Sequence, residues 1–273
     1  MEKISVIGIG KLGLCFSLSL EAAGYDVIGV DINESYVNSI NDKTFNSSEP
    51  MVNEMLAVCK HFKATTNLNE AIEHSDIIFV IVATPSLPSG RYNHSQVDKL
   101  CDNLMSMGPM PSTKHLIINC TTMPQYCDKL QAKISKNNWT VSYNPEFIAQ
   151  GTIITNQENP DMVLIGEANK TIGDKLERIY ETMTMNSPDV HRMSTTEAEI
   201  TKIALNCFLT TKISYTNMIG DIVLASGGRP QVVLDAVGSD TRVGKKLTRY
   251  GFGYGGPCFP RDNRAIGIYA EDI

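Results

Sequence analysis

The sequence predicts an α/β protein whose first part is a doubly wound parallel sheet and whose second part is helical, with one long helix. Three observations predict this class. Short apolar segments alternate with amphipathic ones through the first two-thirds of the 273 residues, a pattern typical of parallel strands with helices on both faces. A glycine-rich turn joins the first apolar segment to the first amphipathic one. After about Met193, apolar residues recur every three and four positions, as in a helix.

The strands and helices of the first part follow from this periodicity. The apolar segments predict buried strands at Ile4 to Ile7, Val27 to Val30, Ile77 to Val82, Leu116 to Ile118 and Met162 to Ile165. The amphipathic segments predict helices at Leu12 to Ala23, Val97 to Met105 and Tyr126 to Ile134. We expect residues 1–193 to form the first domain.

The second part begins with a long predicted helix. Ser194-Thr195-Thr196 followed by Glu197 is a helix-capping signal, and Gly227-Gly228-Arg229-Pro230 predicts the end of the helix. The apolar positions between them are Ile200, Ile203, Ala204, Cys207, Phe208, Thr211, Tyr215, Met218, Ile219 and Ile222. We then expect a helix from Pro230 to Val237, an ordered loop from Arg249 to Asp262, and a helix from Arg264 to Glu271. Residues 194–273 form the predicted second domain.

Composition excludes several classes of protein. The chain is 42% hydrophobic and 20% charged, with a formal net charge of -6, which is ordinary for a folded domain and gives no general attraction to nucleic acid or anionic lipid. A basic cluster at Arg242, Lys245, Lys246 and Arg249 leaves local phosphate binding open. We expect no nucleic-acid partner, no membrane partner and no export signal.

The seven cysteines are odd in number, scattered, and never spaced as Cys-x-x-Cys. This spacing suggests neither a disulfide framework nor a zinc site, so we expect no metal and a reducing, cytoplasmic location.

The glycine turn is Gly8-Ile9-Gly10-Lys11-Leu12-Gly13, and Asp31 follows at the end of the next predicted strand. In such a turn the first glycine permits the bend, the second lets the backbone approach a pyrophosphate, and the third lets helix and strand pack closely. An acidic residue at the position of Asp31 binds ribose hydroxyls and favours NAD over NADP. The alternative is a fold that has kept the turn and lost the cofactor.

Two loops follow predicted strands, where open sheets bind ligands. Ala83-Thr84-Pro85 follows one strand, and Cys120-Thr121-Thr122-Met123-Pro124 follows another. We expect Thr84, Pro85, Thr121 and Thr122 to border the cofactor. Turn capping by threonine and helix initiation by proline explain the same residues equally well.

Several polar residues have the chemistry of an active site. Glu146, in Tyr143-Asn144-Pro145-Glu146-Phe147, suits a general base. Lys202 and Asn206 lie four apart on the long helix, where they could stabilise an oxyanion or simply face solvent. Cys258 lies in a glycine- and proline-rich segment that ends at Asp262, and a thiol held there suits a nucleophile. Free cysteines are otherwise usually inert core residues.

Together these motifs resemble the nucleotide-sugar dehydrogenases, the family of UDP-glucose and GDP-mannose 6-dehydrogenases. The resemblance rests on blocks in the family's order along nearly the whole chain: GIGKLG, VATP, TTMP, NPEF, EAEITKIALNCFLTTKISYTN and GFGYGGPCFPRD. The last block is the most specific. The resemblance implies a Rossmann domain, NAD as cofactor and a nucleotide-sugar substrate.

The resemblance also implies roles for individual residues. The C6 alcohol would be oxidised twice, with Cys258 holding a thiohemiacetal and then a thioester. Lys202 and Asn206 would stabilise the oxyanion, Asp262 and Thr122 would position a water, and Glu146 would assist hydrolysis. The substrate-binding residues would be Phe147, Lys202, Asn206, Arg242, Tyr254 and Gly255. The long helix, residues 195–226, would be the core of a homodimer.

The sequence departs from the family in three places. Ile148-Ala149-Gln150-Gly151 lacks an arginine and a glutamate that usually follow NPEF, and Tyr126 replaces a glycine after TTMP. Members continue into a second Rossmann-like domain that binds the base, whereas this sequence ends at Ile273. A shortened chain, a partner that supplies the domain, and a different substrate each account for this. A single-step β-hydroxyacid dehydrogenase and a non-catalytic NAD-binding module remain alternative functions.

Overall fold

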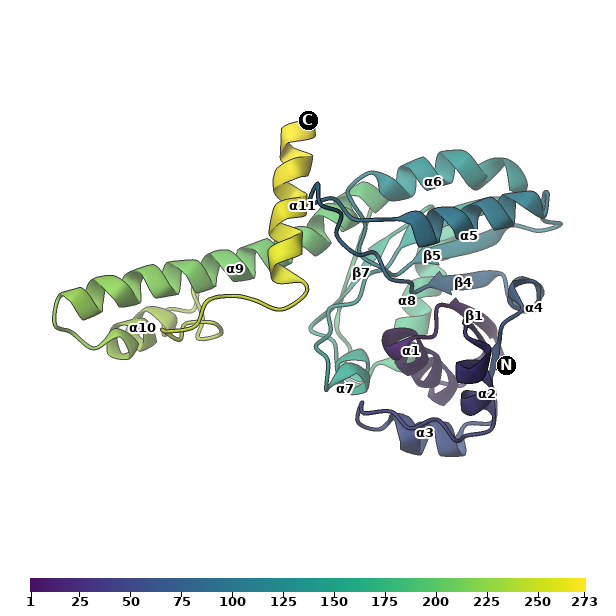
Figure 1. Ribbon diagram of the computed structural model, residues 1–273, viewed down its shortest axis with the longest axis horizontal. Coiled ribbons are helices and arrows are strands. Elements are labelled where there is room, and N and C mark those ends of the chain that lie inside the picture. The colour runs from purple at the N-terminus through teal and green to yellow at the C-terminus, as the bar shows by residue number, and fades with distance from the viewer. The chain divides into compact units, whose positions relative to one another are not determined.

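A computed structural model describes residues 1–273 (Figure 1). Contacts divide the chain into two compact units. The first unit comprises Met1–Pro85 and Asn93–Glu199, and the second comprises Ser86–Tyr92 and Ile200–Ile273. The predicted domains, 1–193 and 194–273, stay a prediction, because compactness alone does not define a folding unit.

The first unit is built on one sheet of eight strands in the order β3-β2-β1-β4-β5-β6-β7-β8. The strands are β1 (Lys3–Ile7), β2 (Asp26–Val30), β3 (Phe62–Thr65), β4 (Ile77–Val80), β5 (Lys114–Ile118), β6 (Trp139–Tyr143), β7 (Met162–Gly166) and β8 (Asp189–Met193). Neighbouring strands are parallel except β6 and β7, which pair antiparallel at Tyr143 and Gly166. The predicted α/β class is confirmed, with this one antiparallel pair as a correction to an all-parallel sheet.

Helices cover both faces of the sheet. They are α1 (Lys11–Ala22), α2 (Glu34–Asn41), α3 (Val52–Val58), α4 (Leu68–His74), α5 (Ser95–Ser106), α6 (Tyr126–Ile134), the 3-10 turn η1 (Ser135–Asn137), α7 (Ile153–Glu158) and α8 (Lys170–Met183). Helices α1, α7 and α8 contribute to one buried apolar cluster, and α4, α5 and α6 contribute to another. Along β4, Ile77 and Phe79 point into the first cluster, and Ile78 and Val80 into the second. This alternation explains why the strands are apolar throughout.

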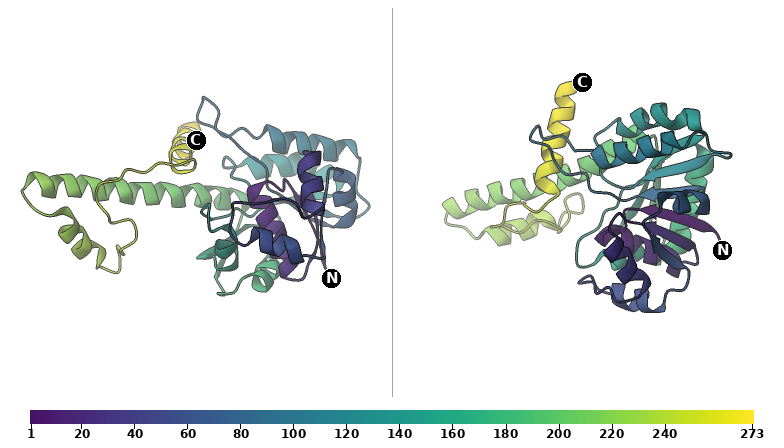
Figure 2. Two further views of the ribbon diagram at one scale, coloured as in Figure 1. Left: turned by 60° about the horizontal axis from the view of Figure 1, so that its bottom comes forward. Right: turned by 45° about the vertical axis from the view of Figure 1, so that its right-hand side comes forward.

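The second unit contains most of α9 (Thr195–Ala225), together with α10 (Pro230–Gly238) and α11 (Phe259–Asp272). After α9 the chain turns back along that helix through α10, as Figure 2 shows. The long helix is confirmed, and its cap forms as predicted: the Glu197 N–H donates to the Ser194 hydroxyl at 3.3 Å, and the Ser194 N–H donates to the Glu197 carboxylate at 2.9 Å.

The predicted loop from Arg249 to Asp262 is wrong at its end. Helix α11 begins at Phe259, five residues before the predicted start at Arg264. Pro260 lies in the first turn, where a helix tolerates proline because that N–H has no partner within the helix. Asp262 is therefore a helical residue, and its backbone N–H donates to the Cys258 carbonyl at 3.0 Å.

The apolar residues of α9 beyond its first turns are largely exposed. The exposed fractions are 65% for Phe208, 51% for Tyr215 and 56% for Ile222. The apolar periodicity correctly predicts a helix, but most of these side chains are not buried within this chain. None of the helices combines the length and apolar character needed to cross a membrane.

Candidate active site

The three glycines of the first turn have three different surroundings. Gly8 has a φ of +91°, and a Cβ there would lie 2.4 Å from the Ile81 carbonyl oxygen. A Cβ on Gly13 would lie 2.0 Å from the Gly8 oxygen, whereas a Cβ on Gly10 would meet nothing within 4 Å. Packing thus requires glycine at Gly8 and Gly13, while Gly10 leaves open space in front of the N-terminus of α1. This arrangement fits a dinucleotide pyrophosphate.

Beside the turn lies a pocket that suits the adenosine half of a dinucleotide. It is lined by Ile7, Gly8, Gly10, Val30, Asp31, Ile32, Ile81, Val82, Ala83 and Gln96. The Asp31 carboxylate accepts a hydrogen bond from the Asn33 N–H at 3.0 Å, which orients it at the end of β2. Ile32 next to it is 99% exposed, so an apolar side chain is available to cover a base. Gln96 of α5 was not predicted, because nothing in the sequence links it to the glycine turn.

The side chains of Lys11 and Leu12, the other two predicted cofactor-binding residues of the turn, have different surroundings. The Lys11 ammonium lies 3.9 Å from the carboxylate of Glu49, which is itself buried and accepts a hydrogen bond from the Ile153 N–H at 2.9 Å. The Leu12 side chain packs against the buried core. These two residues therefore offer a ligand their backbone N–H groups at the start of α1.

The two threonine loops contact each other. The Thr84 hydroxyl donates to the Thr121 carbonyl at 2.8 Å, which joins the loop after β4 to the loop after β5. Thr84 is buried and Pro85 is exposed. The loops thus meet at the carboxyl edge of the sheet, on the side of the glycine turn.

Thr122 is tied to a carboxylate that sequence reasoning missed. Its buried hydroxyl donates to Glu199 Oε1 at 2.9 Å, and the Cys127 N–H donates to the same oxygen at 2.9 Å. Glu199 is fully buried in the first turns of α9, and burial raises its pKa to about 6. The only signal in the sequence was an acidic residue facing the buried side of a helix.

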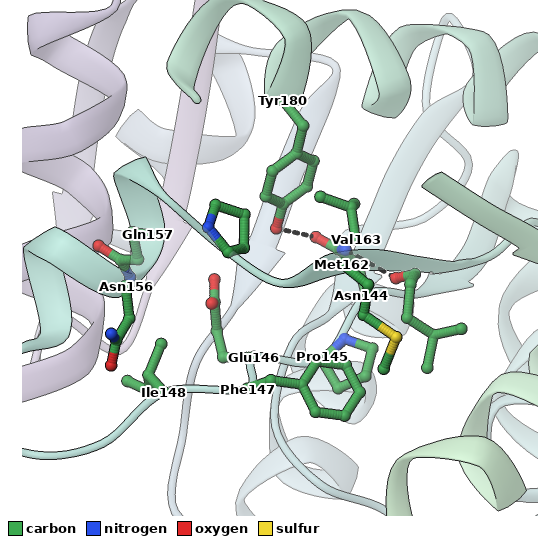
Figure 3. A pocket seen from close by; sticks show the side chains of 12 residues that line it. Asn144, Pro145, Glu146, Phe147, Ile148, Asn156, Gln157, Met162, Val163 and Tyr180 are labelled. Atoms are coloured by element: carbon green, nitrogen blue, oxygen red, sulfur yellow. Dashed lines mark hydrogen bonds between the residues drawn. The ribbon is translucent and has the colours of Figure 1, made fainter. Parts of the chain in front are cut away.

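Glu146 points into a small pocket between α7 and α8 (Figure 3). The preceding Asn144 is buried: its amide donates to the Leu164 carbonyl at 2.9 Å, and its Oδ1 accepts from the Tyr180 hydroxyl at 2.7 Å. Burial raises the pKa of Tyr180, and the nearby Glu146 charge adds to the rise. Phe147 also lines the pocket, and its side chain packs against the apolar cluster on the other face of the sheet.

In the second unit, Asp262 and Asn206 are brought together. The buried Asp262 carboxylate accepts one hydrogen bond from the Asn206 amide at 2.6 Å and another from the Tyr92 hydroxyl at 2.6 Å. Lys202, one turn before Asn206 on α9, is 8% exposed, so the alternative in which it simply faces solvent is wrong. Tyr92 was not predicted, since it lies 170 positions from Asp262.

Cys258 differs from the other cysteines in exposure. It is exposed and occupies the N-cap position of α11. Cys15 and Cys101 are buried, and burial raises the pKa of each to about 12, so these thiols are unreactive. The predicted substrate contacts Tyr254 and Gly255 are exposed in the segment before Cys258.

Arg242 is a strongly exposed residue of the predicted site. Its side chain is 88% exposed, and its guanidinium donates to the Asp240 carboxylate at 2.7 Å. The pair holds the arginine at the surface of the second unit.

Tyr126, the residue that replaces a glycine, forms its own set of contacts at the start of α6. Its ring stacks on His94 with centroids 3.8 Å apart, and its hydroxyl donates to Asp98 at 2.8 Å. The Met123 N–H in turn donates to His94 Nε2 at 3.2 Å. The tyrosine therefore ties the threonine loop to the first turn of α5 rather than disrupting it.

Comparison with known proteins places this geometry in a family. Residues 2–184 match the UDP-glucose/GDP-mannose dehydrogenase family, NAD binding domain. Residues 196–273 match the central domain of the same family.

Individual relatives agree with this match. The chain is 30% identical over 285 residues to GDP-mannose 6-dehydrogenase of Pseudomonas savastanoi pv. phaseolicola, covering 99% of this chain and 64% of the relative. It is 30% identical over 275 residues to UDP-glucose 6-dehydrogenase TuaD of Bacillus subtilis, covering 97% of this chain and 58% of the relative. The chain thus spans about 64% or less of the length of these relatives.

Solved structures show the same fold. A UDP-glucose dehydrogenase from the archaeon Pyrobaculum islandicum superposes with a TM-score of 0.89 at 26% identity, covering 100% of this chain and 64% of that one. A GDP-mannose dehydrogenase from Pseudomonas aeruginosa, solved as a ternary complex, gives 0.79 at 27% identity, covering 98% and 64%. With both family domains matched in order, the chain belongs to the UDP-glucose/GDP-mannose dehydrogenase family and carries its NAD-binding and central domains.

Proposed function

We propose that this protein oxidises the C6 alcohol of a nucleotide sugar to a carboxylate, in two hydride transfers that use two molecules of NAD. The substrate is of the UDP-glucose, UDP-N-acetylhexosamine or GDP-mannose type. The observation that carries the proposal is the exposed Cys258 thiol at the N-terminus of α11, one helical turn before Asp262 and its partner Asn206. A single oxidation of an alcohol has no use for a thiol, whereas in an oxidation that continues to the acid a thiol holds the aldehyde as an adduct for the second hydride transfer.

Cys258 provides the covalent steps. NAD held at the glycine turn and Asp31 would supply the hydride acceptor for each oxidation. After the first, the Cys258 sulfur adds to the aldehyde carbon and the oxygen takes a proton, which gives a thiohemiacetal. That carbon then loses its hydrogen as the second hydride and its hydroxyl proton, which leaves a thioester. Water attacks the thioester carbon, and the carbon–sulfur bond breaks to release the carboxylate and the thiol.

The other residues stabilise charge and guide water. Lys202 and Asn206 donate to the developing oxyanion. Asp262 and Thr122 orient the water, and Glu146 removes its proton as a general base. Phe147, Arg242, Tyr254 and Gly255 contact the substrate. These roles are supported by the resemblance of the motifs and by the chemical type of each side chain.

We further propose a homodimer through the long helix, residues 195–226. The exposed apolar residues of α9, among them Phe208, Tyr215, Met218 and Ile222, support this, because a contiguous apolar face in water marks an interface. A reducing, cytoplasmic location is supported by the seven free thiols, since an oxidised Cys258 could not act as a nucleophile.

The test is Cys258→Ala, assayed by NADH absorbance with UDP-glucose, UDP-N-acetylhexosamines and GDP-mannose in turn. We expect the unchanged chain to yield two NADH per sugar and the variant to lose net turnover, by at least about 10³-fold. Cys207→Ala is the matched control, because Cys207 is a partly buried thiol of the same unit and has no proposed role.

Each alternative function has its own outcome in this assay. One NADH per substrate, unaffected by Cys258→Ala, would support a single-step dehydrogenase. NAD binding by calorimetry, with no response to any of the nucleotide sugars, would support a non-catalytic module and contradict the proposal.

A further inference from the structure

The segment Ser86–Tyr92 lies between β4 and α5 in the sequence, yet its contacts place it in the second unit. It is a small hairpin: Ser86 and Tyr92 form an antiparallel bridge, and the Leu87 N–H donates to the Arg91 carbonyl at 2.8 Å. We call this segment the 86–92 hairpin. Its chain continues directly from Thr84 and Pro85, the predicted cofactor loop.

The 86–92 hairpin is fixed to α11 at several points along the helix. The Arg91 guanidinium donates to both carboxylate oxygens of Asp272, one of them at 2.6 Å. Gly90 has a φ of +83°, and a Cβ there would lie 2.5 Å from the Ile268 side chain, so glycine permits a close approach. These contacts hold Tyr92 against the first turn of α11.

Tyr92 and Asn206 together fix both oxygens of the Asp262 carboxylate. The Tyr92 hydroxyl donates to Oδ1 at 2.6 Å and the Asn206 amide donates to Oδ2 at 2.6 Å. The terminal torsion of an aspartate is soft, so one donor alone leaves the carboxylate free to rotate. Two donors from different elements define its plane, and hydrogen bonds to a charged group are the stronger ones.

The Tyr92 hydroxyl is suited to donate a hydrogen bond to Asp262 at any pH used in an assay. The residue is 2% exposed, and burial together with the Asp262 carboxylate raises its pKa, so the hydroxyl keeps its proton throughout an assay range. The Arg261 guanidinium lies over the ring, 4.3 Å from its centroid, and its Nε is 3.5 Å from Asp262 Oδ1. The cation thus holds the ring and adds positive charge beside the same oxygen.

We propose that Tyr92 is a positioning residue. It orients the Asp262 carboxylate, and through that carboxylate the Asn206 amide bonded to it, for the hydrolysis of the Cys258 thioester. The orientation of Asp262 and Asn206 is a property of the second unit alone. Its catalytic consequence rests on the proposed function. The 86–92 hairpin, which directly follows the predicted cofactor loop in the chain, thus contributes Tyr92 to the hydrolysis step.

The first test needs no turnover. Tyr92→Phe removes only the hydroxyl and keeps the ring under Arg261. In ¹⁵N-labelled protein we expect the Asn206 side-chain amide to exchange with solvent about tenfold faster than in the unchanged chain, because its acceptor becomes mobile. The Asn263 side-chain amide is the internal reference, since the acceptors of its hydrogen bonds are the Thr210 hydroxyl and the Phe259 carbonyl rather than the Asp262 carboxylate. Its exchange should not change.

The matched control is Tyr250→Phe. The Tyr250 hydroxyl donates to Asp221 at 2.7 Å in the same unit, but this pair is exposed and does not contact Asp262. Equal exchange of Asn206 in Tyr92→Phe and in the unchanged chain would overturn the inference. Faster exchange of Asn206 and Asn263 alike would also overturn it, because that result shows general loosening of the unit.

The second test uses NAD with UDP-glucose and with GDP-mannose. For Tyr92→Phe we expect kcat to fall about tenfold with KM within about twofold, and intact-mass measurement to show a sugar adduct accumulating on Cys258. An unchanged kcat, or a fall without an adduct, would contradict the proposed role in hydrolysis. An unchanged chain that is inactive with both sugars would instead contradict the proposed function, and the exchange result would still decide the orientation of Asp262.

Discussion

The two units of the chain bury their apolar side chains differently. In the first unit the strands and helices enclose two apolar clusters, and residues such as Phe79 and Leu104 are fully buried. In the second unit the apolar stripe of α9 is mostly in contact with solvent, with Met218 51% and Ile222 56% exposed. The first unit thus completes its core within the chain, whereas the second leaves a face open to association.

The two units also differ in how their buried carboxylates are hydrogen-bonded. Both units bury carboxylates, but Glu199 in the first unit is held by a hydroxyl and a backbone N–H, and Asp262 in the second by two side chains. Glu199 thus depends in part on a backbone donor, whereas Asp262 depends on two individual side chains. Substitutions in each unit test this difference.

The largest effect is expected for Gly13→Ala in the first unit. Its Cβ would lie 2.0 Å from the Gly8 oxygen, so the close contact between helix and turn must open, at a cost of about 3 kcal/mol in the free energy of unfolding. Urea denaturation measures this, and calorimetry should show NAD binding lost as well.

Gly10→Ala is the matched variant, because a Cβ there meets nothing within 4 Å. It should leave stability nearly unchanged and weaken NAD binding, since the methyl group occupies the approach to the pyrophosphate. Equal stability losses in both variants would show that backbone packing at the turn is not what distinguishes Gly13.

A smaller effect is expected from Glu199, whose pKa burial raises from 4.5 to about 6. The folded state then binds more protons than the unfolded state between these values, so the free energy of unfolding falls as pH rises from about 4.5 to 6, by about 2 kcal/mol. Above pH 6 the loss is complete. Denaturation at pH 4.5 and pH 7.5 should show this fall in the unchanged chain.

Glu199→Gln should not show that fall, because an amide does not ionise and its oxygen still accepts from Thr122 and Cys127. A variant whose stability falls over the same window would assign the pH dependence to another group.

The smallest effect is expected for Met218→Asp combined with Ile222→Asp on α9. Both side chains are exposed within the chain, so monomer stability should change by less than about 0.5 kcal/mol. Association should weaken at least about tenfold, or ~1.4 kcal/mol, because charges would enter an apolar interface. Light scattering should then report the mass of one copy in place of two.

Val58→Asp is the control for that experiment, since Val58 is also an exposed apolar residue, at 73%, but belongs to the first unit. It should leave the mass unchanged. A single-copy mass for the unchanged chain would contradict the proposed dimer.

The regular parts of the fold were predictable from sequence because their signals are local. Strands β1, β2, β4, β5 and β7 and helix α6 (Tyr126–Ile134) follow from apolar periodicity alone, whereas β6, between β5 and β7, was not among the predicted strands. The short helices α3 and α7 and the strand β8 were missed, since they are too short or too polar to show a period. The start of α11 was missed because Pro260 was taken as part of a loop, although proline also begins helices.

The parts of the candidate site that lie in local sequence motifs were predictable. The parts that depend on contacts between residues distant in the sequence were not. The glycine turn and the threonine loops have local signatures. Glu199 and Tyr92 have none: their partners lie 77 and 170 positions away, and only the fold decides which distant side chains meet. Apolar periodicity correctly predicted that α9 is a helix. It cannot distinguish an apolar face that is buried within the chain from one that is exposed.

The 86–92 hairpin also limits how this protein can be divided. A chimera or a fragment cut at residue 200 would keep most of α9, together with α11 and Cys258, but would lose Tyr92, because the hairpin is encoded between β4 and α5. Asp262 would then retain the donor from Asn206 and lose the one from Tyr92. The helical unit is therefore not an exchangeable cassette, and any transplant of it must carry residues 86–92 along.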